Sequence, residues 1–194
     1  MNTFGQNTFE DQSFVNLILT EEKLISKSFY NCTFNNCDFS KSNFTDSLFS
    51  ECIFNSCNFS LTKFTQTKLQ DVTFTECKLL GINFTEINDF IIELGFQKSM
   101  ITDCVFSKLN LNDTNFINCK IENCDFFQTN LSNSDFTNSN LNGSLFENTN
   151  LSKVTFTNAV SYQINPLSNK IKGAKFSLPE AISLLEYFEI EIET

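Results

Sequence analysis

The chain has 194 residues, enough for one domain with its own core, and it is acidic, with 23 Asp and Glu against 13 Lys. Its net charge of −10 leaves nothing to neutralise a row of phosphates, so direct binding to nucleic acid or to an anionic membrane is not expected. The absence of His removes the commonest general base and the commonest metal ligand. We therefore expect no enzyme activity, no bound metal and no cofactor.

Targeting signals are also missing from the sequence. Residues 1–30 lack the basic start and apolar run of a secretory signal. No stretch approaches the roughly 18 apolar residues of a membrane span. These features predict a cytoplasmic protein.

Large apolar residues already recur every five positions near the N-terminus, at Phe4, Phe9, Phe14, Leu19 and Leu24. The residues two places before them are mostly polar, which suits a dry interior poorly. We interpret residues 1–26 as a degenerate leading coil that covers one end of the fold, where an open strand edge would invite aggregation.

The five-residue period becomes strict in residues 27–84. Its central place holds only Phe or Leu, at Phe29, Phe34, Phe39, Phe44, Phe49, Phe54, Phe59, Phe64, Leu69, Phe74, Leu79 and Phe84. A usually small residue stands two places before each centre, and the remaining places are mostly Asn, Asp, Ser, Thr and Lys. A period of five fits neither an α-helix nor a flat strand, but it fits a chain that turns a corner every five residues. Such coils must stack to bury their apolar sides.

Residues 85–98, TEINDFIIELGFQK, interrupt the period. Asn88 is a candidate cap for a short helix through Leu94 that ends at Gly95. The segment is either a tolerated insertion or a functional loop, because loops on rigid scaffolds often carry recognition. For the functional loop, the candidate partner-binding residues are Glu86, Asp89, Phe90, Ile91, Ile92 and Glu93.

The period resumes in residues 99–160, where Phe alternates with an aliphatic residue. The centres are Ile101, Phe106, Leu111, Phe116, Ile121, Phe126, Leu131, Phe136, Leu141, Phe146, Leu151 and Phe156. All eight Cys of the chain stand two places before a centre of one of the two blocks. Cys37, Cys57 and Cys77 are twenty residues apart, so they would stack in one column of the coil. We interpret the Cys residues as small buried side chains.

Residues 161–194 form the predicted C-terminal segment. Ser177 and Glu180 have the spacing of a capping box, and an apolar helical stripe follows them. The helix is either an end cap alone or a cap that also joins two copies in a homodimer. For the dimer, the candidate residues are Leu178, Ile182, Leu185 and Phe188.

The repeats of residues 27–156 resemble the pentapeptide-repeat family, whose consensus is A-(D/N)-L/F-x-x. The resemblance implies an all-β solenoid, a right-handed quadrilateral β-helix with four pentapeptides per coil, and the 24 clear units then make six coils. Residues ten apart would lie on opposite sides, so Phe rings would form facing ladders. The expected core ladder is Phe34, Phe54, Phe74, Phe106, Phe116, Phe126, Phe136, Phe146 and Phe156.

The β-helix, the interrupting loop and the C-terminal apolar helix together resemble the Qnr-type quinolone-resistance branch of that family. This resemblance implies an acidic dimeric rod that mimics DNA, binds the type II topoisomerases DNA gyrase and topoisomerase IV, and protects them from fluoroquinolones. However, residues 31–84 carry five acids against four Lys, so the charge is dilute. The alternative is a general scaffold or regulatory protein–protein interaction module. An acidic stripe left free of Lys would favour the topoisomerase hypothesis.

Overall fold

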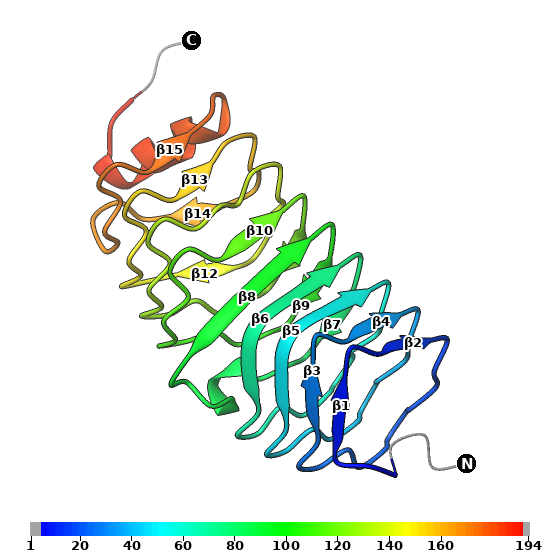
Figure 1. Ribbon diagram of the computed structural model, residues 1–194. Helices are drawn as coiled ribbons and strands as arrows, with labels where there is room; N and C mark the ends of the chain where they lie inside the picture. Colours follow the sequence, from blue (N-terminus) through cyan, green and yellow to red (C-terminus); the bar gives the residue numbers. More distant parts are fainter. Residues whose placement is uncertain (1–4, 192–194) are drawn as a thin grey trace.

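The computed structural model describes residues 5–191, so residues 1–4 and 192–194 of the two predicted end segments lie outside the described part. The chain winds into a right-handed, four-sided parallel β-solenoid of about eight turns (Figure 1). This confirms the predicted β-helix. It has more turns than the six counted from clear repeats, because the irregular segments at both ends also form rungs.

Short strands make the sides of the solenoid. They are β1 (Thr8–Glu10), β2 (Ser13–Val15), β3 (Ser28–Tyr30), β4 (Thr33–Asn35), β5 (Leu48–Asn55), β6 (Lys68–Thr75), β7 (Lys78–Leu80), β8 (Ile92–Gln97), β9 (Met100–Thr102), β10 (Asn115–Ile117), β11 (Lys120–Glu122), β12 (Leu145–Phe146), β13 (Thr155–Phe156), β14 (Gln163–Ile164) and β15 (Lys175–Phe176). The largest sheet follows the order β1-β3-β5-β6-β8-β10, with β2 and β4 alongside, and β7, β9 and β11 form another side. Each strand pairs with the strand about twenty residues away.

The corners follow from the residue types between the strands. The residue two places after nearly every centre has a positive φ, as at Asn31 (48°), Asn36 (53°) and Asp113 (60°). Asn and Asp tolerate this left-handed conformation better than most residues. Their side chains also bond between turns, since the Asn36 amide donates to Asn16 Oδ1 at 2.7 Å. Polar corner residues therefore turn the chain and tie successive coils together.

Two long columns of Phe rings run through the core, and two short ones, Phe9–Phe29–Phe49 and Phe39–Phe59, lie in the N-terminal half. The first is Phe14, Phe34, Phe54, Phe74, Phe96, Phe116, Phe136, Phe156 and Phe176, with neighbouring ring centroids 4.7–5.3 Å apart. The second is Phe44, Phe64, Phe84, Phe106, Phe126 and Phe146. The columns meet edge to face, for example Phe116 and Phe126 at 5.9 Å and 89°. Every residue of the predicted core ladder lies in one of these columns.

The interrupting segment does not form the expected helix from Asn88. Instead, Asn83 caps a 3-10 turn, η1 (Phe84–Glu86), and strand β8 follows. Phe96 is fully buried and lies between Phe74 and Phe116 in the first column. Stacking of Phe96 between two rings outweighs the weak local preference for a helix, so Gly95 lies within a strand rather than at a helix end.

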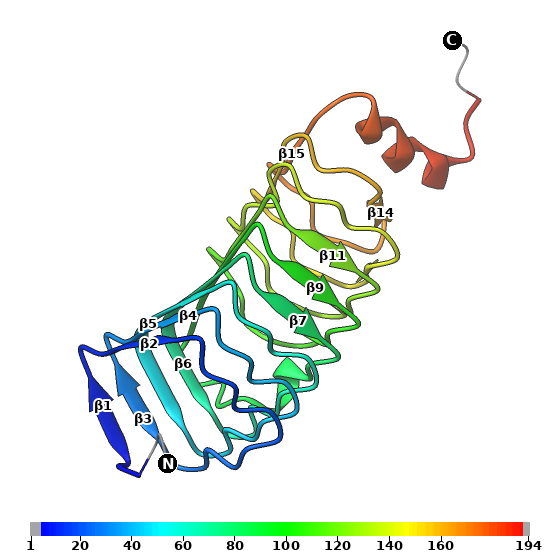
Figure 2. The same cartoon turned by 90° about the vertical axis from the view of Figure 1, so that its right-hand side faces the viewer.

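The C-terminal helix η2 (Glu180–Phe188) lies across the end of the stack (Figure 2). It is a 3-10 helix rather than an α-helix, and the predicted capping box does not form. Ser177 follows the last strand, and its Oγ accepts the backbone N–H of Asn158 at 3.0 Å, so it is not at the cap. Leu184 packs against the core, as expected of a cap.

We expect Phe116→Ala to lower the free energy of unfolding by about 3–5 kcal/mol, because it removes a buried ring from the middle of a column. Phe127→Ala is the matched control, since Phe127 points outward and is only half-buried. The control should cost less than about 1 kcal/mol. Denaturant unfolding of both variants tests this, and equal losses would contradict the ladder as the main source of stability.

Candidate interaction surfaces

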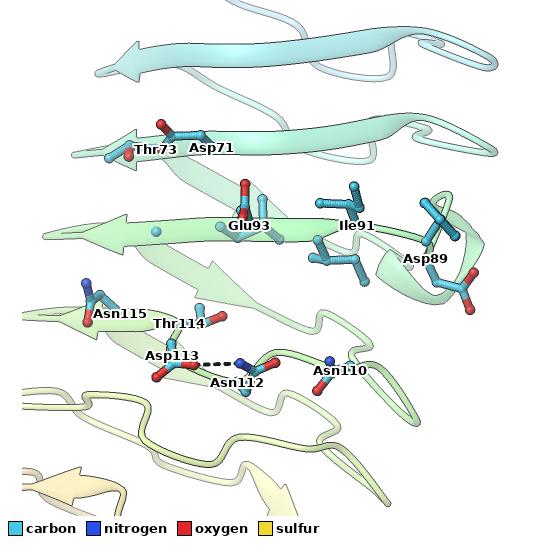
Figure 3. Close-up of a pocket in the computed structure, with 14 residues that line it drawn as sticks. Asp71, Thr73, Asp89, Ile91, Glu93, Asn110, Asn112, Asp113, Thr114 and Asn115 are labelled. Carbon is cyan, nitrogen blue, oxygen red and sulfur yellow. Dashed lines mark hydrogen bonds between the residues drawn. The ribbon is translucent and has the colours of Figure 1, made fainter.

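The interrupting segment opens the wall of the solenoid. Phe84 and Phe96 are twelve residues apart, whereas the equivalent Phe64 and Phe74 are ten apart, so two extra residues must leave the rung. Strand β8 pairs with β6 starting at Ile92, but it pairs with β10 only at Gly95–Gln97. A cavity of about 470 Å³ lies where the two rungs separate (Figure 3).

Five of the six predicted loop residues line this cavity, namely Asp89, Phe90, Ile91, Ile92 and Glu93. Phe90 is 88% exposed and Ile91 is 42% exposed. We call these two residues the apolar tip. An apolar tip that projects beside carboxylates can contact a protein partner through both kinds of interaction.

The structure places the sixth predicted residue, Glu86, elsewhere. Its carboxylate accepts the Thr65 hydroxyl at 2.8 Å and the Asn83 amide at 3.2 Å. It lines a different cavity, together with Leu61 and Lys63. Glu86 therefore fastens the η1 turn to the preceding rung and does not share a surface with Asp89 and Glu93.

Neighbouring rungs complete the cavity with residues that sequence reasoning missed, chiefly Asp71, Asn110, Asn112, Asp113 and Thr114. Counting coils could have found two of them. Asp113 lies twenty residues after Glu93, and Asp71 lies 22 before it, which is one coil plus the two-residue insertion.

Four acidic residues stack at one corner of successive rungs, and we call them the acidic corner row: Glu51, Asp71, Glu93 and Asp113. The strand registers Cys52 to Val72, Val72 to Leu94, and Gly95 to Asn115 align them. Figure 3 shows Asp71, Glu93 and Asp113 on three consecutive rungs. The first Lys at this corner is Lys153, four rungs beyond Asp71.

Lysines gather at other corners and sides. Within residues 5–191, the ion pairs are Lys41–Glu21 at 2.8 Å, Lys98–Glu76 at 3.7 Å and Lys120–Glu122 at 2.9 Å, and none involves the acidic corner row. The charge is therefore uneven around the solenoid, and one corner carries unneutralised carboxylates.

The cysteines form inward columns as predicted. Cys57 Sγ accepts the Cys37 N–H, and Cys77 Sγ accepts the Cys57 N–H, each at 3.4 Å. All eight thiols are free and buried. Burial raises the pKa of Cys52 to about 12 and that of Cys119 to about 11, so both stay protonated at neutral pH.

The four predicted dimerisation residues are exposed, three of them on helix η2 and Leu178 just before it. Leu178 is 79% exposed, and Ile182, Leu185 and Phe188 are exposed as well. We call these four residues the C-terminal apolar face. Within residues 5–191, no helix is both long and apolar enough to cross a membrane, and no three His, Cys, Asp or Glu side chains are arranged to hold a metal ion.

Stacked five-residue sides with left-handed corners and a Phe core define a pentapeptide-type β-solenoid. The model of the "Pentapeptide repeat region" family matches residues 27–89 and 90–176, and the chain belongs to this family. Proteins of the family are generally structural or binding proteins rather than enzymes. A sequence search of curated proteins finds no match.

Two solved structures illustrate the shared fold. Trypsin-treated QnrB1, a plasmid-mediated fluoroquinolone resistance protein, has a TM-score of 0.72 at 19% identity, and the match covers 96% of this chain and 100% of QnrB1. HetL, involved in heterocyst differentiation regulation in the cyanobacterium Nostoc sp. strain PCC 7120, has a TM-score of 0.70 at 15% identity, with 88% and 87% covered. At these sequence identities, the likeness shows a shared fold and nothing beyond it.

We expect the buried thiols to be unreactive in the native protein, because the thiolate is the nucleophile and burial disfavours it. Titration with a disulfide reagent such as DTNB should detect none of the eight Cys in the folded chain and all eight after unfolding in guanidinium chloride. Rapid release of the chromophore from native protein would contradict this expectation.

Proposed function

We propose that this protein is a non-enzymatic DNA mimic that binds a type II topoisomerase, DNA gyrase or topoisomerase IV, and confers fluoroquinolone resistance. The acidic corner row carries the proposal. Its residues recur once per rung, and paired strands lie about 4.8 Å apart, compared with one phosphate per ~3.4 Å along a DNA strand. The DNA-binding groove of a topoisomerase is basic because it binds phosphates. A rod with a line of carboxylates can therefore compete with DNA for this groove.

The predicted loop residues would contribute to the same interface. Asp89 and Glu93 add charge beside the row, and Phe90 and Ile91 add apolar contact area. Exposed aromatic residues often dominate binding energy at protein interfaces. We therefore assign the apolar tip the role of anchoring the partner, and Ile92 the role of supporting the tip from a half-buried position.

DNA supercoiling by gyrase in the presence of ciprofloxacin tests the function. We expect the protein to restore supercoiling, and the effect should weaken at high salt because the interaction is electrostatic. Inhibition without rescue would retain topoisomerase binding but contradict resistance. No effect on gyrase or topoisomerase IV would overturn the proposal.

The variant Phe90→Ala separates binding from folding. Because Phe90 is 88% exposed, we expect its thermal midpoint to be unchanged, while affinity for the topoisomerase falls about tenfold or more. Phe127→Ala is the control, since it removes an outward Phe from another side of the solenoid. Equal affinities of the two variants would exclude the tip as an anchor.

We also propose that two copies form a homodimer through the C-terminal apolar face, which lies at the end of the stack beyond the last rung. Leu185→Lys should then give a monomer by light scattering, because a charge in a buried interface is costly. Leu167→Lys is the control, since Leu167 is exposed but lies outside the helix. An unchanged mass for Leu185→Lys would exclude this interface.

A second function remains supported by a different observation. Apart from the acidic corner row, the sides of the solenoid carry mainly uncharged Asn, Ser and Thr, which suits a general scaffold or regulatory interaction module without topoisomerase activity. HetL, which is involved in the regulation of heterocyst differentiation, has nearly the same TM-score as QnrB1, 0.70 against 0.72. The absence of any effect in the gyrase supercoiling assay would favour this function.

A further inference from the structure

The cavity beside β8 has an unusual charge balance. Four carboxylates line it, those of Asp71, Asp89, Glu93 and Asp113, and no Lys does. Asn112 donates to Asp113, but no ion pair reaches any of the four within the described part of the chain. The cavity therefore favours a cationic group.

Thr114 lines the cavity, and its hydroxyl has no hydrogen-bond partner in the described residues. At equivalent inward positions the hydroxyl donates to a carbonyl of the preceding turn, as Ser134 does to Leu111 at 2.9 Å and Thr129 to Phe106 at 2.9 Å. Thr114 is only 2% exposed and lines the cavity, yet its hydroxyl bonds to nothing in residues 5–191; only its backbone N–H is paired, with Ser134. This hydroxyl is therefore available to a ligand in the cavity.

The polar groups are spread around the walls rather than gathered at one point. Among the described residues, they do not form a group that could hold a metal ion. The walls offer carboxylates from three rungs, the amides of Asn110 and Asn112, and the Thr114 hydroxyl. A guanidinium group suits this arrangement, because its five N–H donors fan out in a plane, whereas an ammonium group is a compact point charge.

The apolar tip indicates the source of that group. Phe90 and Ile91 stand on the rim of the cavity and expose apolar surface that a small polar ligand would leave in water. A protein surface can cover the tip and place a basic side chain in the cavity at once. We propose that this cavity binds the guanidinium group of an arginine side chain presented by a protein partner. The inference deepens the proposed function, because the arginine would belong to the same partner.

The site can be tested without the partner. Nα-acetyl-arginine amide is titrated into the isotopically labelled full-length protein, and backbone amide shifts are followed by NMR. We expect saturable shifts at residues 89–95 and 110–115 with a Kd of the order of millimolar. The uncharged analogue Nα-acetyl-citrulline amide should bind at least about tenfold more weakly. Equal binding of the two amides, or no shifts at the cavity, would overturn the proposal.

Matched variants locate the binding energy. Asp71→Asn with Asp113→Asn removes two cavity charges, and Asn keeps the left-handed corners that these positions require. The control is Asp46→Asn with Asp103→Asn, which makes the same chemical change at corners of other sides. Only the cavity variant should weaken arginine binding, by about tenfold or more. Equally weakened arginine binding in both variants would overturn the site, because it would show only a general attraction between opposite charges.

Thr114→Val tests the hydroxyl separately. We expect weaker binding of the arginine amide with an unchanged thermal midpoint, because the hydroxyl satisfies no bond in the fold. Unchanged binding would remove Thr114 from the site.

The two proposals fail in distinguishable ways. If the arginine amide binds but topoisomerase does not, the site stands and another partner supplies the arginine. If topoisomerase binds but the arginine amide does not, or if the amide binds the Asp71→Asn, Asp113→Asn variant as well as it binds wild type, the proposed function stands and the arginine site is overturned.

Discussion

The whole structure depends on vertical register between equivalent inward side chains of successive turns. Phe rings in the first column lie about 5 Å apart, for example 4.7 Å between Phe116 and Phe136, and parallel strands repeat at nearly the same spacing. Ring stacking and backbone pairing therefore impose one common repeat. Each turn must place its large residue over the one below. This requires a left-handed corner after most sides and leaves room only for a small residue, usually Cys, Ser or Thr, beside most rings.

This register also determines how the fold accommodates extra residues. The first column passes from Phe74 to Phe96 without a gap, although 22 residues separate them. The two additional residues are expelled outward, which raises Phe90 and Ile91 from the wall and separates the rung from residues 110–113. The apolar tip and the cavity are thus two consequences of keeping one column of rings intact.

Corner positions leave the chain free to vary its surface chemistry. A corner needs a residue that tolerates positive φ, and Asp, Asn, Lys, Glu and Gly all occur there. Because corners stack, a choice repeated once per coil produces a line of charge along the rod. Glu51, Asp71 and Asp113 occupy such corners, and Glu93 in strand β8 stacks in line with them. Packing does not demand the charge of these four residues. Interaction with a basic partner gives these carboxylates a role that the fold itself does not.

The sequence alone determined the solenoid, the core ladders and the Cys columns, because a five-residue period with large inward residues has few other ways to bury them. Local signals misled at two places where tertiary packing was stronger. Asn88 and Gly95 suggested a helix, yet burial of Phe96 made a strand, and Ser177 suggested a cap, yet it bonds to Asn158. Only the tertiary structure brought Asp71, Glu93, Asp113 and Thr114 together, because their proximity depends on where two extra residues leave the stack.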